Sequence, residues 1–304
     1  MSNRSLELIP SRIAAGERSF SFEFFPPKTD AGEEKLWRTI HDLEPLDPSF
    51  VSVTFGAGGS TRDRTIRITE GIARETRFTA MAHLTCVGAT VAELREVIGD
   101  FAAAGISNVL ALRGDPPGGL GQPWQQFPGG LNHADELVRL VKSMGDFTVG
   151  VAAFPEGHPE AANLDEDAHA LLRKQEAGAD FAVSQFFFNS DDYFRLVERA
   201  SSWGVTLPII PGIMPVTDYK QIKRFAELSG AAFPAAMAQE FAAIADDPEA
   251  VRSLGVAHAT KMCEELLAGS APGLHFYTLN RSTATMEIYE ALGLAQRFQA
   301  TSIH

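Results

Sequence analysis

One pattern dominates this sequence: short strand-like segments alternate with helical segments eight times between Ser19 and Leu294. The strand-like segments have apolar residues at every second position or in short apolar runs, and the helical segments have them three or four residues apart. A chain of this kind can bury its apolar faces in a closed (β/α)8 barrel or in an open, doubly wound sheet. We therefore predict an α/β protein, with the (β/α)8 TIM barrel as the first choice and the doubly wound sheet as the alternative.

The expected elements follow from these periods and from the Pro and Gly residues between them. Strands are expected at residues 19–25, 50–55, 79–85, 108–115, 147–154, 181–187, 207–213 and 273–279. Helices are expected near residues 30–46, 60–72, 91–104, 134–144, 165–177, 193–202, 218–228 and 284–294. Two extra helices, at 234–245 and 248–268, are inserted before the last strand, and the Pro- and Gly-rich segment 116–130 is expected to be a loop over the barrel mouth.

Motifs argue against the doubly wound alternative. Gly56 and Gly58 begin a GxGxxG pattern, but Thr61 stands where the third glycine of a dinucleotide-binding fingerprint belongs, and the P-loop signature is absent. Composition does not shift along the chain. We therefore expect a single catalytic barrel domain over residues 1–304, with no regulatory domain.

Composition excludes several classes of function. The formal net charge is −13, so a surface for nucleic acid or anionic membrane is not expected, because both need dense Lys and Arg. Cys86 and Cys263 fit neither a disulfide framework nor a CxxC motif, which indicates a reducing compartment. The first residues lack a secretory hydrophobic segment, and no later run approaches membrane-spanning length. We expect a soluble, cytoplasmic protein.

The first strand indicates where a site should lie. Phe20, Phe22 and Phe24 fall on one face, suited to packing under helices, while Ser21 and Glu23 fall on the other. In a closed parallel barrel the small and polar face points inward. Glu23, the last residue on that face, is expected to point into the barrel mouth, where TIM-barrel active sites lie.

The carboxyl-terminal ends of the other expected strands are also mostly polar or ionisable. Each side chain alone has a structural explanation, such as a hydrogen-bonded core histidine. Their placement at one rim instead favours a functional site. These residues are Glu23, Thr54, His83, Arg113, Asp115, Phe154, His158, Gln185, Met214, Tyr277 and Arg281.

The residue types at this rim narrow the chemistry. No HxxEH or HxH ligand pair is present, so no metal site is expected, although His83 and His158 could approach carboxylates. Cys86 and Ser184 lack a nucleophile motif such as GxSxG. An organic cofactor in the barrel mouth, with Glu23 as acid or base, is the interpretation that remains.

Nine motifs, in order along nearly the whole chain, resemble those of the bacterial 5,10-methylenetetrahydrofolate reductases that consist of a catalytic domain alone. They are SFEFFPPK (21–28), FVSVTFGAGGSTRDRT (50–65), HLTC (83–86), LALRGDPP (110–117), AAFPEGHPE (152–160), AGAD with SQFFF (177–188), PIIPGIMPV (208–216), MAQ (237–239) and HFYTLNR (275–281). The resemblance implies a (β/α)8 barrel that binds FAD and uses a reduced nicotinamide, NADH or NADPH, to convert methylenetetrahydrofolate to 5-methyltetrahydrofolate. It also implies ping-pong hydride transfer through FAD, a supply of methyl groups for methionine synthesis, a homo-oligomer and no control by adenosylmethionine.

The resemblance assigns roles at the folate side of the site. Glu23 matches the general acid, which delivers a proton as the imidazolidine ring opens to a 5-iminium cation. Asp115 matches an aspartate beside flavin and pterin that stabilises this cation. Acting as an acid near neutral pH would require a raised Glu23 pKa, which we expect from burial and from repulsion by Asp115. The implied folate contacts are Glu23, Asp115, Gln185, Gln221, Phe225, Tyr277 and Arg281.

For FAD, the resemblance implies a second set of residues. Arg113, His158 and Lys174 would offset the diphosphate charge, and Asp167 would hold ribose hydroxyls. Phe154 departs from the family, whose members often have Tyr at this position. The full set is Thr54, His83, Leu112, Arg113, Gly114, Asp115, Ala134, Phe154, His158, Asp167 and Lys174.

Other functions remain open from sequence. A cofactor-free barrel lyase or aldolase could use Glu23 as a base, and a folate-binding protein without activity would need Phe225 and Arg281 but not Glu23. The same flavin chemistry could also run in the oxidative direction on methyltetrahydrofolate. The sequence does not distinguish NADH from NADPH, because it contains no separate nucleotide fold with the usual acidic or basic selector.

Overall fold

The computed structural model describes residues 9–54, 59–116, 122 and 124–294. Among these residues, eight parallel strands close into a barrel in which each strand pairs with its neighbours in sequence and the last pairs with the first. The predicted TIM barrel is confirmed. The strands are β1 (Ser19–Phe24), β2 (Phe50–Val53), β3 (Ala80–Thr85), β4 (Asn108–Leu112), β5 (Thr148–Ala153), β6 (Phe181–Phe186), β7 (Ile209–Ile213) and β8 (Gly273–Tyr277).

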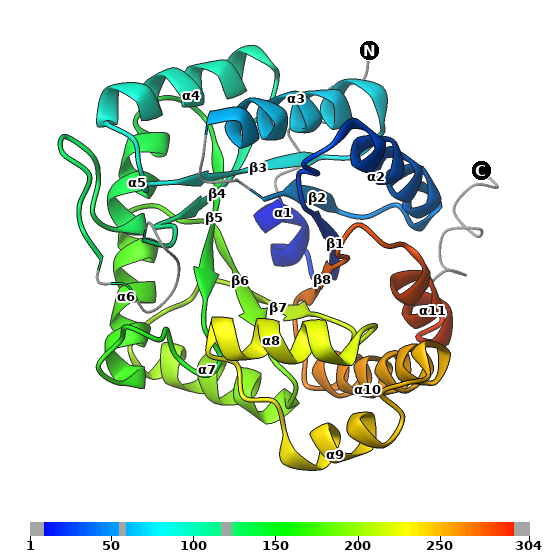
Figure 1. The fold of residues 1–304 in the computed structure, drawn as a ribbon. Coiled ribbons are helices and arrows are strands. Elements are labelled where there is room, and N and C mark those ends of the chain that lie inside the picture. The colour runs from blue at the N-terminus through cyan, green and yellow to red at the C-terminus, as the bar shows by residue number, and fades with distance from the viewer. Residues whose placement is uncertain (1–8, 55–58, 117–121, 123, 295–304) are drawn as a thin grey trace.

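Helices surround this barrel, and Figure 1 shows them as a ring outside the strands. Their buried sides pack against the outward face of the sheet in one large core that includes Phe22, Phe24 and Phe276. The helices are α1 (Ile9–Ala14), α2 (Asp30–Leu43), α3 (Gly59–Glu75), α4 (Val91–Ala103), α5 (Ala134–Lys142), α6 (Leu164–Glu176), α7 (Ser190–Ser202), α8 (Tyr219–Ser229), α9 (Ala235–Ala243), α10 (Pro248–Ala268) and α11 (Thr283–Ala291), with a 3₁₀ turn, η2, at Glu44–Leu46.

Some predicted features fall in segments that the structure leaves out. Most of the glycine-rich turn after β2 lies outside the described residues, as do residues 117–121 and 123 of the predicted loop over the mouth. The predicted strands mostly extend one or two residues too far, because residues such as Phe25 and Phe187 continue the alternation after the sheet pairing has ended.

The barrel interior is apolar towards the amino-terminal ends of the strands and polar towards their carboxyl-terminal ends. Phe50, Met81, Leu110, Phe181 and Ile210 fill much of it in one cluster. This cluster also contains Ile9 of α1, so α1 closes the amino-terminal end of the barrel; Figure 1 shows it at the barrel centre. Sequence reasoning did not predict this helix, because at Ile9–Ala14 it is too short for a clear helical period.

The extra helices before the last strand are confirmed, but their assignment changes. Helix α10 lies in the ring, contacting α7, β7 and α11, and its Met262 and Leu266 belong to the large core. Helices α8 and α9 instead pack in a smaller cluster that contains Ile222 and Phe241. The inserted pair is therefore α8 and α9 rather than α9 and α10, and Figure 1 shows α8 in front of β6 and β7.

Candidate active site

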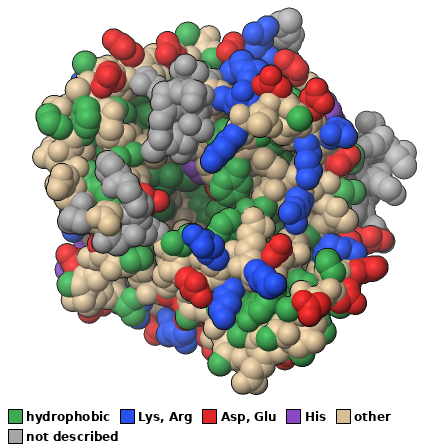
Figure 2. Space-filling view, in the orientation of Figure 1, with side chains coloured by type: hydrophobic (Ala, Val, Ile, Leu, Met, Phe, Trp, Pro, Cys, Tyr) green, Lys and Arg blue, Asp and Glu red, His purple; other side chains and the backbone are tan. Residues whose placement is uncertain are grey.

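A cavity of about 1450 Å³ opens at the carboxyl-terminal ends of the strands. Figure 2 shows it as a hollow lined largely by apolar side chains. All of the predicted site residues line it except Gln221, in the first turn of α8, and Arg281, which is exposed after β8. The predicted residues that line it are Glu23, Thr54, His83, Leu112, Arg113, Gly114, Asp115, Ala134, Phe154, His158, Asp167, Lys174, Gln185, Met214, Phe225 and Tyr277.

Glu23 lies at the end of β1, with an exposed fraction of only 5%. The strand register places Ser52 of β2 beside it, and it places His275 of β8 beside Ser21. Ser52 Oγ donates a hydrogen bond to Glu23 Oε2 at 3.4 Å, and His275 Nε2 lies 3.3 Å from the same oxygen. His83 Nε2 of β3 lies 3.4 Å from it. Three polar side chains from neighbouring strands thus surround one carboxylate oxygen.

A chain of hydrogen bonds leads from Glu23 into the barrel interior. His275 Nδ1 lies 2.8 Å from Ser21 Oγ. An ionised carboxylate can only accept, so His275 Nε2 carries the proton that it donates to Glu23. Nδ1 accepts from the Ser21 hydroxyl when the ring is neutral and donates to it when the ring is charged. Sequence reasoning missed His275, although it has the same parity as Tyr277 on the last strand. That parity was the only signal that could have identified it.

The expected rise in the Glu23 pKa is wrong for this arrangement. Burial by itself raises the pKa of Glu23, but His83, the hydrogen bonds from His275 and Ser52 and the charge of His275 together lower it below the usual value. Burial lowers the pKa of His83, which Glu23 opposes only in part. Near neutral pH, Glu23 is therefore a carboxylate, and burial disfavours the charged form of His83 beside it. The groups that shift Glu23 are these neighbours rather than Asp115.

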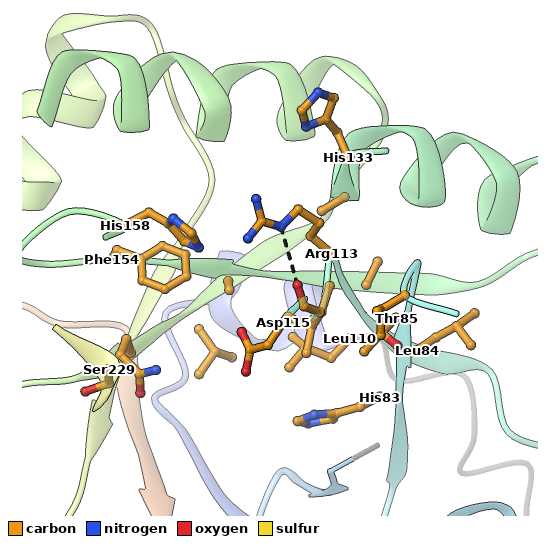
Figure 3. Close-up of a pocket in the computed structure, with 18 of the residues that line it drawn as sticks. His83, Leu84, Thr85, Leu110, Arg113, Asp115, His133, Phe154, His158 and Ser229 are labelled. Carbon is orange, nitrogen blue, oxygen red and sulfur yellow. Dashed lines mark hydrogen bonds between the residues drawn. The ribbon is translucent and has the colours of Figure 1, made fainter. Parts of the chain in front are cut away.

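The residues beyond β4 form the charged side of the cavity. Arg113 makes a bidentate ion pair with Glu160, with nitrogen–oxygen distances of 2.6 and 2.9 Å. Its guanidinium also lies over the Trp124 ring, 4.6 Å from the centroid. Asp115 is exposed to the cavity beside it (Figure 3). Glu160 and Trp124 also line the cavity and were missed because neither lies at the end of a strand.

The opposite side of the cavity comes from β5 and α6. The Phe154 and His158 rings meet edge to face with centroids 4.8 Å apart, and in Figure 3 Arg113 points towards them. Lys174 Nζ donates to the backbone oxygen of Ala152 at 2.8 Å and lies 6.0 Å from the Phe154 ring. Burial lowers the pKa of Lys174 and of His158, and it raises the pKa of Asp167.

An irregularity in β6 places the polar residues of the third side. The register of β6 on β7 shifts between Val183 and Phe186, which turns Gln185 into the cavity. Gln185 Oε1 accepts a bond from the backbone of Phe186 at 3.0 Å, so the amide nitrogen is left to meet a ligand. The Tyr277 hydroxyl donates to the backbone oxygen of Ser184 at 2.8 Å, so this hydrogen bond stabilises the backbone at the register shift.

Two features of the cavity wall are suited to a large polar ligand. His83 Nε2 and Thr85 Oγ1 are buried polar atoms without a hydrogen-bond partner among the described residues, and a bound ligand is one explanation for unsatisfied groups of this kind. At Gly114, which has φ of +85°, a Cβ would lie 2.8 Å from Val87 Cγ1, so only glycine fits. The volume exceeds the roughly 300–1,000 Å³ of an ordinary ligand pocket. These residues therefore fit a cofactor as large as FAD.

No group of three or more His, Cys, Asp or Glu side chains in the part of the chain that the structure describes is arranged to hold a metal ion. No helix within the described ranges combines the length and the apolar character needed to cross a membrane.

Comparison with known proteins identifies the family. The model of the methylenetetrahydrofolate reductase family matches residues 8–293. The 5,10-methylenetetrahydrofolate reductase of Escherichia coli K12 is 43% identical over 279 residues, covering 92% of each chain. Methylenetetrahydrofolate reductase (NADH) 1 of Arabidopsis thaliana is 37% identical over 95% of this chain and 50% of its own length.

A solved structure supports the fold alone. An uncharacterized protein from Clostridium thermocellum, described as binding two copies of 5-methyl-5,6,7,8-tetrahydrofolic acid, superposes with a TM-score of 0.64 at 16% identity. The match covers 97% of this chain and 100% of that one. With the family match over most of the barrel and its mouth, the chain belongs to the methylenetetrahydrofolate reductase family.

Proposed function

We propose that this protein reduces 5,10-methylenetetrahydrofolate to 5-methyltetrahydrofolate, with a reduced nicotinamide nucleotide as electron donor and FAD as the bound carrier. The observation that carries the proposal is Glu23: a buried carboxylate at the base of a large cavity, in a chain that belongs to this family. The names of the bacterial and plant relatives support the folate substrate and a nicotinamide donor.

Glu23 is the proposed proton donor for opening of the imidazolidine ring. Its lowered pKa keeps it ionised near neutral pH, so the carboxyl must gain a proton before it can act as an acid. A pterin ring over Glu23 would bury it further, and burial is the largest single influence that raises the pKa of this group. Ser21 and His275 hold the carboxylate in place and connect it to the barrel interior.

Asp115 is the proposed electrostatic partner of the 5-iminium cation. Its carboxylate lies at the cavity edge, and its neighbour Arg113 is neutralised by Glu160. An acidic group fixed beside a developing positive charge stabilises it more in a cavity than in bulk water. Gln185 offers its amide nitrogen, and Phe225 offers an aromatic face, to the same ligand.

The residues around Arg113 and Lys174 are proposed to hold FAD. When bound there, FAD would take a hydride from the nicotinamide and pass it to the folate, so the two substrates would use the cavity in turn. Arg113, His158 and Lys174 would face the diphosphate, and Asp167 the ribose hydroxyls. Thr85 Oγ1 would offer this ligand a buried polar atom that makes no hydrogen bond within the described residues, as would His83 Nε2 on the side away from Glu23.

An absorbance spectrum of the purified protein tests this function directly. We expect flavin absorbance, its loss on anaerobic addition of NADH or NADPH, and its return on addition of methylenetetrahydrofolate. A colourless protein that does not bind added FAD would contradict the proposal and would favour a cofactor-free lyase.

A further inference from the structure

The connection between β5 and α6 bridges the two halves of the cavity. Its Phe154 and His158 line the part proposed for FAD, and its Glu160 holds Arg113 beyond β4. On its other side, the connection meets the carboxyl-terminal end of α8. This helix contributes Phe225 to the part of the cavity proposed for folate.

One side-chain hydrogen bond joins this connection to the segment after α8. Glu156 Oε1 accepts from the backbone N–H of Ala232 at 2.8 Å. Beside it, Gly230 has φ of +77°, and a Cβ there would lie 3.0 Å from Pro159 Cγ, so the Pro159 ring packs closely against the Gly230 backbone. The crevice left between the segments is only about 10 Å³, about the space of one water molecule.

Helix α8 packs at the barrel mouth rather than against the large core. Its buried residues Ile222 and Ala226 lie in the smaller cluster with α9, Phe186 of β6 and Met214 after β7. Glu156 is half-buried, and burial raises its pKa. The bond from Ala232 lowers this pKa; of the charged residues on α7, Asp192 raises it and Arg195 lowers it. The bond of Glu156 to Ala232 therefore connects the segment after α8 to the connection that follows β5.

We propose that Glu156 is a positioning residue: by accepting the hydrogen bond of Ala232, it holds α8 against the β5–α6 connection and so keeps Phe225 over the cavity. The expected effect of Glu156 on catalysis rests on the proposed function. The tie between the two segments can be tested without activity. Glu156 touches neither the proposed substrate nor the cofactor, so its loss should affect folate binding more than flavin chemistry.

The test compares Glu156→Ala with Glu156→Gln, which keeps an oxygen acceptor but removes the charge. Because one hydrogen bond contributes roughly 0.5–1.5 kcal/mol, Glu156→Ala should raise the KM for methylenetetrahydrofolate about 2- to 12-fold. Flavin reduction by the nicotinamide should stay within about twofold, and Glu156→Gln should remain near the parent because the acceptor is kept. Glu227→Ala, an exposed carboxylate on α8 itself, is the matched control and should change nothing.

Amide hydrogen exchange gives a readout that does not depend on activity. Exchange at Ala232 should be faster in Glu156→Ala than in Glu156→Gln or Glu227→Ala. If the parent does not turn over methylenetetrahydrofolate, the proposed function fails, yet this difference in exchange would still support the tie. Unchanged exchange in Glu156→Ala would overturn it. Equal loss of flavin and of thermal stability in both Glu156 variants would also overturn it, because a general support of the fold would then explain the effect.

Discussion

Replacing Glu23 with Gln should separate the two half-reactions of the proposed mechanism. Flavin reduction by a nicotinamide needs no proton delivered to a folate nitrogen, whereas ring opening of methylenetetrahydrofolate does. The amide keeps the side-chain shape, and its oxygen can still accept from Ser52 and His275. Glu23→Gln should therefore leave the fold and flavin occupancy intact while it removes the acid.

The size of the effect follows from the buried setting of Glu23. At 5% exposure, bulk water has little access to replace the missing proton donor. General acids contribute roughly 10²- to 10⁴-fold to rate, which is about 3–5 kcal/mol of barrier. The folate half-reaction should slow by this factor, while flavin reduction should change only a few-fold.

The pH dependence gives the sign of the same effect. The pKa of Glu23 is lowered, so the carboxyl loses its proton at a lower pH than an ordinary glutamate does. If the acid form is needed, the folate half-reaction of the parent should speed up as pH falls towards that pKa. Glu23→Gln should lose this dependence, and flavin reduction should not show it in either protein.

Anaerobic stopped-flow absorbance of the flavin, with each substrate mixed separately, measures both steps. Glu75→Gln removes an exposed carboxylate at the end of α3 and is the matched control. Equal slowing of both half-reactions would refute the reasoning, because Glu23 would then support the fold or position the flavin. A folate step that stays fast in Glu23→Gln would refute it as well.

Three further predictions follow from the cavity wall. Arg113→Ala should release FAD, and more of it at high salt, because the substitution removes a cation and leaves Glu160 unpaired. Gel filtration with flavin absorbance measures FAD occupancy. An occupancy as high as in the exposed control Arg74→Ala would contradict this prediction. Phe225→Ala should weaken folate binding by about 1–3 kcal/mol through loss of an aromatic contact, and an unchanged dissociation constant for 5-methyltetrahydrofolate would count against stacking. His275→Leu removes interactions that lower the Glu23 pKa, so the pH profile of the folate half-reaction should move to higher pH; a profile that stays in place would show that His275 does not act on Glu23.

The sequence alone determined the architecture and the end of the barrel that carries the site. Strand alternation and helical spacing are local properties, so the barrel and the inward direction of Glu23 could be derived from period and parity. The strand ends then identified part of the cavity wall, including His83, Arg113 and Gln185. Motif resemblance supplied Lys174 and Phe225, which lie on helices where strand parity gives no information.

Only the tertiary structure decided which side chains meet. Strand register places His275 beside Ser21 and within reach of Glu23, although the histidine and the glutamate are 252 residues apart in the sequence. The pKa of Glu23 is the sum of burial and of neighbours from three other strands, so its direction could not be derived from one strand. Likewise, both α8 and α10 are expected as helices from the sequence, but only their packing against the closed barrel shows that α10 joins the ring while α8 lies at the mouth. The physical reason is that helix periodicity specifies a buried face but not the surface that covers it.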